Sequence, residues 1–326
     1  MPVRLERDNG ELRLVGVEIE FQGQDVGMLA ELMRKTLGGE LERVSRAEYK
    51  LFLPGGEHYR IELDYALLKE MAGYEDDLAQ YVGASGEIAF DALEAVSSLL
   101  VPCEIVAPPL PVESLSQPMN AIVEALRYAG CKGTRRSILY AFGVHLNVEP
   151  PDLQSATILS FMRAFVVLYE WILWKGKVDP SRRVTPYIDD FPSEYKLLIL
   201  DSAYQPDTGQ LISDYLEYNP TRNRALDMLP MFSHLDAQAV KRVVDDTLVK
   251  ARPAFHYRLA NSCVDEPDWS IANPWNLWVC LEALAADTDT LSVLSREYSE
   301  DLQRLTRTLD TRWRDRIQAW IDSTSV

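Results

Sequence analysis

Two glutamates share one face of an expected strand near the N-terminus, in LVGVEIEFQG (residues 14–23). Side chains alternate along an extended chain, so Glu18 and Glu20 lie about 7 Å apart on the same side. The opposite side carries the apolar residues Val15, Val17, Ile19 and Phe21. Two like charges at that spacing repel unless water or a cation separates them. The pattern is typical of a solvated strand face or of a face that binds metal ions.

Four later segments repeat this alternation of an apolar face with a polar one. Their polar members are His58, Arg60, Glu62 and Asp64 in residues 58–65, Glu104 in 103–110, His145, Asn147 and Glu149 in 143–149, and His256 and Arg258 in 254–261. A merely solvated face would normally mix Thr, Ser and Lys. Carboxylates and imidazoles bind divalent cations, and guanidinium groups bind phosphate oxygens. The five strands together therefore favour a metal and phosphate site.

Composition narrows the class of protein. The chain has 326 residues and a formal net charge of −17, which argues against nucleic acid or an anionic membrane surface as a partner. Its four cysteines form no CxxC pair and match no zinc spacing, which is typical of reduced thiols in a cytoplasmic protein. The N-terminus lacks the apolar segment of a signal peptide. Residues 155–175 are the most apolar stretch and predict a buried core helix rather than a membrane span.

The rest of the chain predicts helices and strands without a regular βαβ rhythm. The expected helices are 24–39, 66–83, 87–101, 116–130, 155–175, 273–285 and 289–321, and the expected strands, besides the opening one, are 49–54, 58–65, 103–110, 140–150 and 252–262. Residues 179–232 are rich in Pro, Asp, Tyr and Arg and predict a long irregular segment with one helical piece, of the kind that often carries function. The sequence contains no GxxxxGK[ST], GxGxxG or GxSxG motif, so the common alternative nucleotide and hydrolase sites are missing.

Five segments in this order, GVEIEF, CEIVAPPL, GVHLNV, RNRALDMLP and AFHYRL, resemble the amidoligase family of the carboxylate–amine ligase superfamily. Glutamine synthetase and glutamate–cysteine ligase are its best-known relatives. The resemblance covers about residues 15–260 and implies an α+β fold, with a curved, funnel-like, mainly antiparallel sheet and helices on its outer face, as in the glutamine synthetase catalytic domain. It also implies one catalytic domain over residues 1–326, with C-terminal helices (273–322) packed on it.

The resemblance further implies ATP and Mg²⁺ or Mn²⁺ as cofactors. The reaction would join a small-molecule or peptide carboxylate to an amine through an acyl phosphate. The implied metal ligands are Glu18, Glu20, Glu62, Glu104, His145 and His256, with Asp64 as a further candidate. Arg222, Arg224 and Arg258 would contact the phosphates or the substrate carboxylate, and Asn147 would orient substrate or water. Arg182 and Arg183 are secondary candidates for a loop over the site.

One position departs from the family's pattern. The family's late strand reads Glu-x-Arg, whereas this chain has His256 two residues before Arg258. Histidine suits Mn²⁺ better than Mg²⁺, so the identity of the metal is open. Two other functions stay open: a small-molecule kinase of the same superfamily, and a non-catalytic protein that binds nucleotides or amino acids.

Overall fold

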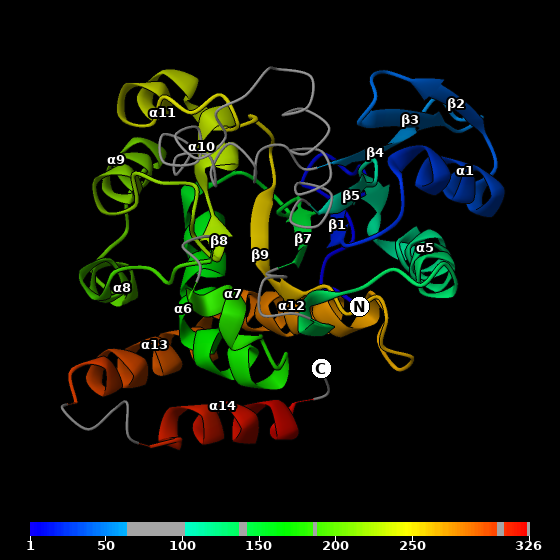
Figure 1. Cartoon of the computed structure of the whole chain (residues 1–326). Coiled ribbons are helices and arrows are strands. Elements are labelled where there is room, and N and C mark those ends of the chain that lie inside the picture. The colour runs from blue at the N-terminus through cyan, green and yellow to red at the C-terminus, as the bar shows by residue number, and fades with distance from the viewer. Residues whose placement is uncertain (64–101, 137–141, 185–187, 305–309, 325–326) are drawn as a thin grey trace, which may run out of the picture.

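The fold is α+β and is built on one large antiparallel sheet (Figure 1). The structure is a computed structural model, and it describes residues 1–63, 102–136, 142–184, 188–304 and 310–324. The sheet has nine strands in these residues, in the order β2-β3-β4-β5-β1-β7-β9-β8, with β6 paired to β1. The order ends at β2 and β8, so the described sheet is open rather than closed into a barrel. The α+β class and the antiparallel sheet agree with the sequence analysis.

Strands β1, β3, β4, β5, β7 and β9 form where the sequence predicted strands, whereas β2, β6 and β8 were not predicted as separate strands. Their bounds are β1 (Leu14–Phe21), β2 (Glu40–Arg43), β3 (Glu48–Phe52), β4 (His58–Leu63), β5 (Cys103–Val106), β6 (Leu110–Pro111), β7 (Gly143–Val148), β8 (Leu226–Asp227) and β9 (Phe255–Asn261). The apolar face of β1 is fully buried: Val15, Val17, Ile19 and Phe21 are 0% exposed. That burial fixes the register, because a slip of one residue would move the whole apolar face to the other side of the sheet.

The first helix begins and ends where its caps predict. In α1 (Val26–Leu37), the Asp25 carboxylate accepts hydrogen bonds from the backbone of Gly27 and Met28. The helix stops at Gly38, whose φ of 78° favours glycine. Helix α1 packs on β3 and β4 and against α5 (Ser116–Tyr128). Two 3₁₀ turns, η2 (Val112–Ser114) and η3 (Thr134–Arg136), flank α5.

The most apolar helix, α6 (Ser155–Lys175), is the only helix in the described part of the chain that is long and apolar enough to cross a membrane. Two thirds of its most apolar window (67%) is nevertheless buried inside the protein. It packs against α12 (Ala272–Ala286), α13 (Thr288–Leu302) and α14 (Arg312–Ser323) (Figure 1). This environment agrees with the expected core helix.

The prediction that residues 179–232 are mostly irregular was wrong. This segment forms α7 (Pro180–Val184), α8 (Ser193–Leu200), α9 (Thr208–Tyr218), strand β8 and α10 (Leu229–Leu235), and α11 (Ala237–Val243) follows it. Several of its prolines and aspartates lie at helix starts: Pro192 precedes α8, Pro230 lies in the first turn of α10, and Asp207 accepts a hydrogen bond from Gln210 N–H at the start of α9. Its tyrosines pack as a buried aromatic cluster, with the Tyr195 and Tyr215 ring centroids 5.9 Å apart.

The C-terminal region also differs from the prediction, because two helices replace the single one expected over 289–321. Helix α13 ends at Leu302, and α14 begins at Arg312 after Asp310 accepts a hydrogen bond from the Arg312 N–H. The Trp313 ring of α14 packs against that of Tyr298 in α13 with ring centroids 4.7 Å apart, and its indole donates to the Val167 carbonyl of α6. The helices expected at 66–83 and 87–101, and Asp64, lie outside the described residues.

Candidate metal and phosphate site

The register of the central strands brings together acidic side chains that are far apart in the sequence. Glu20 of β1 lies directly across from Glu104 of β5, which in turn lies across from Glu62 of β4. On the other side of β1, Glu18 lies across from His145 of β7. Residues directly opposite each other point to the same face of a sheet. The polar faces predicted separately for each strand are therefore one continuous surface.

The same surface continues across β7, β9 and β8. Asn147 of β7 lies across from His256 of β9, and His256 lies across from Asp227 of β8. The pairing of β7 with β9 shifts register between Val144 and Leu146, so a bulge lies opposite His145. Bulges often redirect side chains beside functional sites.

A first group of possible metal ligands consists of Glu18, His145 and His256, whose ligand atoms lie within 4.8 Å of one another. His145 Nδ1 is 2.9 Å from Glu18 Oε2, and His256 Nε2 is 3.8 Å from the same oxygen. The two imidazole rings meet edge to face with centroids 5.3 Å apart. These donors come from β1, β7 and β9, so only the folded sheet assembles them.

A second group shares the same histidine and consists of Glu20, Glu104 and His145. His145 Nε2 lies 3.5 Å from Glu20 Oε1, and the other oxygen of Glu20 accepts a 2.6 Å hydrogen bond from the Gly143 N–H. Glu104 is only 9% exposed. Buried carboxylates gathered this closely need a compensating positive charge. Two adjacent groups of carboxylate and imidazole donors are a set that divalent cations accept.

Glu18 remains ionised in this partly buried position. Burial alone would raise the pKa of its carboxyl group, but the hydrogen bond from His145 and the interactions with the neighbouring His256 and Arg252 side chains outweigh burial and hold the pKa well below its usual range. Its second oxygen accepts a 2.9 Å hydrogen bond from the Asn147 amide. Glu18 thus presents an anionic carboxylate at neutral pH.

His256 is held with one nitrogen free of hydrogen bonds. Its Nδ1 lies 3.4 Å from Asp227 Oδ2, while its buried Nε2, on the Glu18 side, has no hydrogen-bond partner. Burial and the positive charge of Arg252 lower the pKa of His256 well below its usual value, so the ring is neutral. A neutral imidazole with an unpartnered buried nitrogen, oriented by a carboxylate, is the usual arrangement of a metal-ligating histidine. The residues present therefore fit a divalent cation.

Asp227 was not singled out from the sequence, although it lies inside the quoted segment RNRALDMLP. Burial raises the pKa of its carboxyl group to about 6, against the opposing charge of Arg258. Its Oδ1 accepts a hydrogen bond from the Leu229 N–H, which fixes the carboxylate and directs Oδ2 toward His256. The signal available in the sequence was its position within a segment that already contained two candidate arginines.

Arginines border the carboxylates on the β9 side of the surface. Arg258 is 8% exposed, donates to the Arg222 carbonyl at 3.2 Å, and keeps a buried Nε without a hydrogen-bond partner. Arg222 itself pairs with Asp246 at 3.1 Å. Arg252, the first residue of the expected strand 252–262 and not singled out from the sequence, donates to Asn147 Oδ1 at 2.6 Å. Its Nε is likewise buried without a partner, and such donors suit anionic oxygens.

Two predicted residues lie apart from the two groups. Glu62 lies across from Glu104 but belongs to neither group, and its carboxylate is 3.4 Å from Arg60. Arg224 donates to the main-chain carbonyl of Asp190 at 2.7 Å. It therefore supports the chain before α8, and among the described residues no hydrogen bond or ion pair joins it to the two groups, although its buried Nε has no hydrogen-bond partner.

Arg182 holds the bulge rather than forming part of a loop over the site. Its guanidinium is buried and donates to the carbonyls of Arg258, Leu259 and Ala260. Burial lowers its pKa to about 10, so the group stays charged at neutral pH. Gly143 leaves room for this guanidinium, because a Cβ there would overlap Arg182 Nη2. Arg183 is exposed on the same short helix, α7.

We expect Gly143→Ala to displace Arg182 and to lower the free energy of unfolding by about 1–3 kcal/mol, the usual cost of overpacking. Urea unfolding would measure the loss. Gly55→Ala is the matched control, because nothing lies within 4 Å of a Cβ at that turn position. Equal stability of the two variants would contradict the role assigned to the Gly143–Arg182 contact.

Comparison with protein-family models matches residues 11–280 to the family described as "Putative amidoligase enzyme". The match covers well over half of the chain, so the protein belongs to this amidoligase family, as the five segments predicted. Family membership supports an enzyme with a ligase-type function. No curated protein and no solved structure matches the chain.

Proposed function

We propose that the protein is an ATP-dependent amidoligase that joins a carboxylate to an amine through an acyl-phosphate intermediate. The observation that carries the proposal is the convergence of Glu18, Glu20, Glu104, His145 and His256 in two adjacent groups. Membership of the amidoligase family supports a ligase-type reaction. The substrates are a small-molecule or peptide carboxylate and an amine.

The chemistry explains why such a site needs charged groups of both signs. A carboxylate is a poor acyl donor, so one of its oxygens first attacks the γ-phosphorus of ATP; an O–P bond forms, the bond to the β-phosphate oxygen breaks, and ADP leaves. The amine nitrogen then attacks the acyl carbon; a C–N bond forms, the C–O bond to phosphate breaks, and the amine loses a proton as inorganic phosphate leaves. Both steps crowd anionic oxygens together, and preorganised positive groups lower their barriers.

The residues of this chain take distinct parts in that scheme. Glu18, Glu20, Glu104, His145 and His256 would hold divalent cations, which supply positive charge to phosphate oxygens when bound. The mixed carboxylate and imidazole donors suit Mn²⁺ at least as well as Mg²⁺.

The arginines take the other part. Arg258 and Arg252 present buried Nε–H donors without partners, and Arg258 would bind the transferred phosphoryl group. Asn147 lies between Glu18 and Arg252, where it would orient substrate or water. Arg222 lies next to Arg258 and would assist it.

Product analysis tests the proposal against its two alternatives. The protein is incubated with ATP, Mn²⁺ or Mg²⁺, a panel of amino acids and short peptides, and hydroxylamine as a general amine. A ligase forms a hydroxamate together with stoichiometric ADP and phosphate. Stable phosphorylated product without amide would instead show a kinase, and nucleotide binding without any turnover across the panel would show a non-catalytic binder.

We expect Asp227→Asn to loosen His256 and to weaken Mn²⁺ binding by about 10–100-fold, the usual effect of removing the partner of a ligating histidine. In the intact protein Asp227 favours the tautomer with the proton on Nδ1, which leaves Nε2 available. Long-range ¹H–¹⁵N NMR reads this tautomer directly, and the chain has only four histidines to assign. Asp207→Asn, at the start of α9, is the control. An unchanged His256 tautomer together with unchanged Mn²⁺ affinity would rule out this positioning role.

A further inference from the structure

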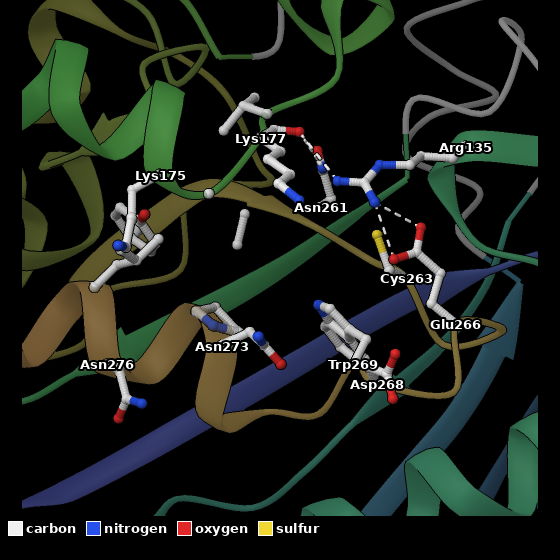
Figure 2. Close-up of a pocket in the computed structure, with 16 residues that line it drawn as sticks. Arg135, Lys175, Lys177, Asn261, Cys263, Glu266, Asp268, Trp269, Asn273 and Asn276 are labelled. Atoms are coloured by element: carbon white, nitrogen blue, oxygen red, sulfur yellow. Dashed lines mark hydrogen bonds and ion pairs between the residues drawn. The ribbon is translucent and has the colours of Figure 1, made fainter.

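A second polar pocket, outside the site described above, opens at the end of β9. It has a volume of about 500 Å³, within the usual range for small-molecule sites. Figure 2 shows the residues that line it. Lys177 follows α6, Asn261 is the last residue of β9, and Arg135 forms an ion pair with Glu266. Trp269 lies just before α12, and Asn273 lies in its first turn. Tyr257 also lines it. We propose that this pocket is a ligand site for a small organic carboxylate, on the opposite face of β9 from the metal and phosphate site.

The backbone of Lys177 is the first observation that points to a ligand. Helix α6 ends in a Schellman arrangement, with Val178 N–H bonded to the Leu173 carbonyl and Lys177 N–H to the Trp174 carbonyl. Lys177 occupies the left-handed position of this motif with φ 47°, and it is the only non-glycine residue with positive φ in the described part of the chain. Glycine is the usual residue there, because a side chain carries a conformational cost. Such a cost is typically kept where the side chain has a function.

The strained turn is held in place from β9. The Asn261 amide donates to the Lys177 carbonyl at 2.8 Å, and its oxygen accepts from the Asp179 N–H at 3.0 Å. Asn261 is 5% exposed, so both bonds are protected from water. The position of Lys177 at the pocket is thus built into the fold.

Tyr257 provides an independent observation. It is 1% exposed, and its buried hydroxyl has no hydrogen-bond partner. Buried hydroxyl groups are nearly always hydrogen-bonded, and an orphan needs an explanation. A carboxylate oxygen in the pocket would accept this hydrogen bond.

The charges around the pocket favour an anion. Arg135 is compensated by Glu266 through two hydrogen bonds of 2.7 and 2.9 Å. The other charged side chains that line the pocket are the positive Lys175 and Lys177 and the negative Asp268. Neither lysine forms an ion pair with the described residues. The first turn of α12 also borders the pocket and contains no acidic residue. A positive pocket in a chain of net charge −17 is an exception to the overall charge.

The pocket is close enough to the metal and phosphate site to influence it. Tyr257 lies between His256 and Arg258 in β9. Because side chains alternate along a strand, the Tyr257 side chain points to the opposite face of the sheet from the side chains of His256 and Arg258. From the turn at Lys177 the chain runs directly into α7, where Arg182 binds the carbonyls of Arg258, Leu259 and Ala260. An occupied pocket would therefore hold the strand that carries both functional side chains.

Calorimetric titration with glutarate, at low salt and without nucleotide, tests the inference, with the uncharged diamide glutaramide as the matched ligand. We expect glutarate to bind and glutaramide to bind at least about tenfold more weakly, since charge-assisted hydrogen bonds are the stronger ones. Lys177→Gly and Tyr257→Phe should each weaken glutarate binding about tenfold or more. Both variants should keep the melting temperature of the intact protein, because the first relieves a strained backbone and the second removes an unsatisfied hydroxyl.

Two controls separate this pocket from the proposed active site. Lys241→Ala removes an exposed lysine of α11 and should leave glutarate binding unchanged, as should Glu18→Gln. Binding that is abolished by Glu18→Gln but kept in both pocket variants would place the carboxylate at the acidic groups and overturn the inference. Equal affinity for glutarate and glutaramide, or no binding of glutarate at all, would overturn it as well, without bearing on the ligase proposal.

Discussion

Glu18→Gln is expected to lower ATP-dependent hydroxamate formation by at least about 100-fold, the usual loss when a preorganised electrostatic group is removed from an active site. The substitution keeps the shape of the side chain and an oxygen that can accept from Asn147, so the sheet should be preserved. It removes the negative charge that faces both His145 and His256. Phosphate release under saturating ATP and Mn²⁺, with the best substrate from the panel, measures the effect.

A matched control separates this loss from a general effect of removing a glutamate from the sheet. Glu42 lies on β2 of the same sheet with an exposed side chain, and Glu42→Gln should retain full activity. Circular dichroism should show the same fold for both variants. Activity of Glu18→Gln within a few-fold of the intact protein would contradict a role for the first ligand group in catalysis.

The second large effect concerns stability rather than catalysis. Arg13, immediately before β1, is 0% exposed and forms a two-pronged ion pair with Glu282 of α12, with N–O distances of 2.8 and 2.7 Å. The same guanidinium donates to the carbonyls of Arg4 and Glu149, and Glu282 also accepts from the Trp278 indole. Removing one member of a buried ion pair leaves the other charge buried without a partner. We therefore expect Arg13→Met to lower the free energy of unfolding by about 3–5 kcal/mol.

Urea unfolding of four proteins would test this expectation as a double-mutant cycle: the intact chain, Arg13→Met, Glu282→Leu and the double variant. The double variant should lose less than the sum of the single losses, because it leaves no unpaired charge. The exposed pair of Arg34 and Glu31 is the control, and Arg34→Met should change stability by less than about 1 kcal/mol. A loss of similar size for Arg13→Met and Arg34→Met would show that the buried pair does not anchor β1 to α12.

Much of the sheet could be predicted from the sequence because each strand buries one face. Alternating burial leaves a period of two that is readable in a short segment, as in β1, β4, β7 and β9. The candidate ligands on those strands followed from the same alternation. Helix α1 was equally readable, because its caps at Asp25 and Gly38 are local signals.

The pairing of strands was not readable in the same way. Glu18 and His145 are 127 residues apart, and alternation gives the face of each residue but not the partner strand or the register. The bulge opposite His145 is held by Arg182 of α7. It therefore depends on a contact with another element and could not be predicted from the sequence around β9. Asp227 and Arg252 were missed for this reason, since their places in the site come from β8 and from the turn before β9.

The error over residues 179–232 has a different origin. Pro, Asp and Tyr are weak helix formers in isolation, and composition alone favoured an irregular segment. Burial of aromatic side chains such as Tyr195 and Tyr215, which are 0% exposed, overrides that weak preference. Short helices in a compact protein depend on such packing more than on propensity.

We propose that the two groups of carboxylates and imidazoles together form a metal-dependent nucleotide site. The most direct measurement is calorimetric titration of a non-hydrolysable ATP analogue into the intact protein and into Glu18→Gln, without metal and then with Mg²⁺ or Mn²⁺. We expect binding that requires the metal and that Glu18→Gln abolishes or strongly weakens. Binding of the same strength with and without metal, and in both proteins, would contradict it.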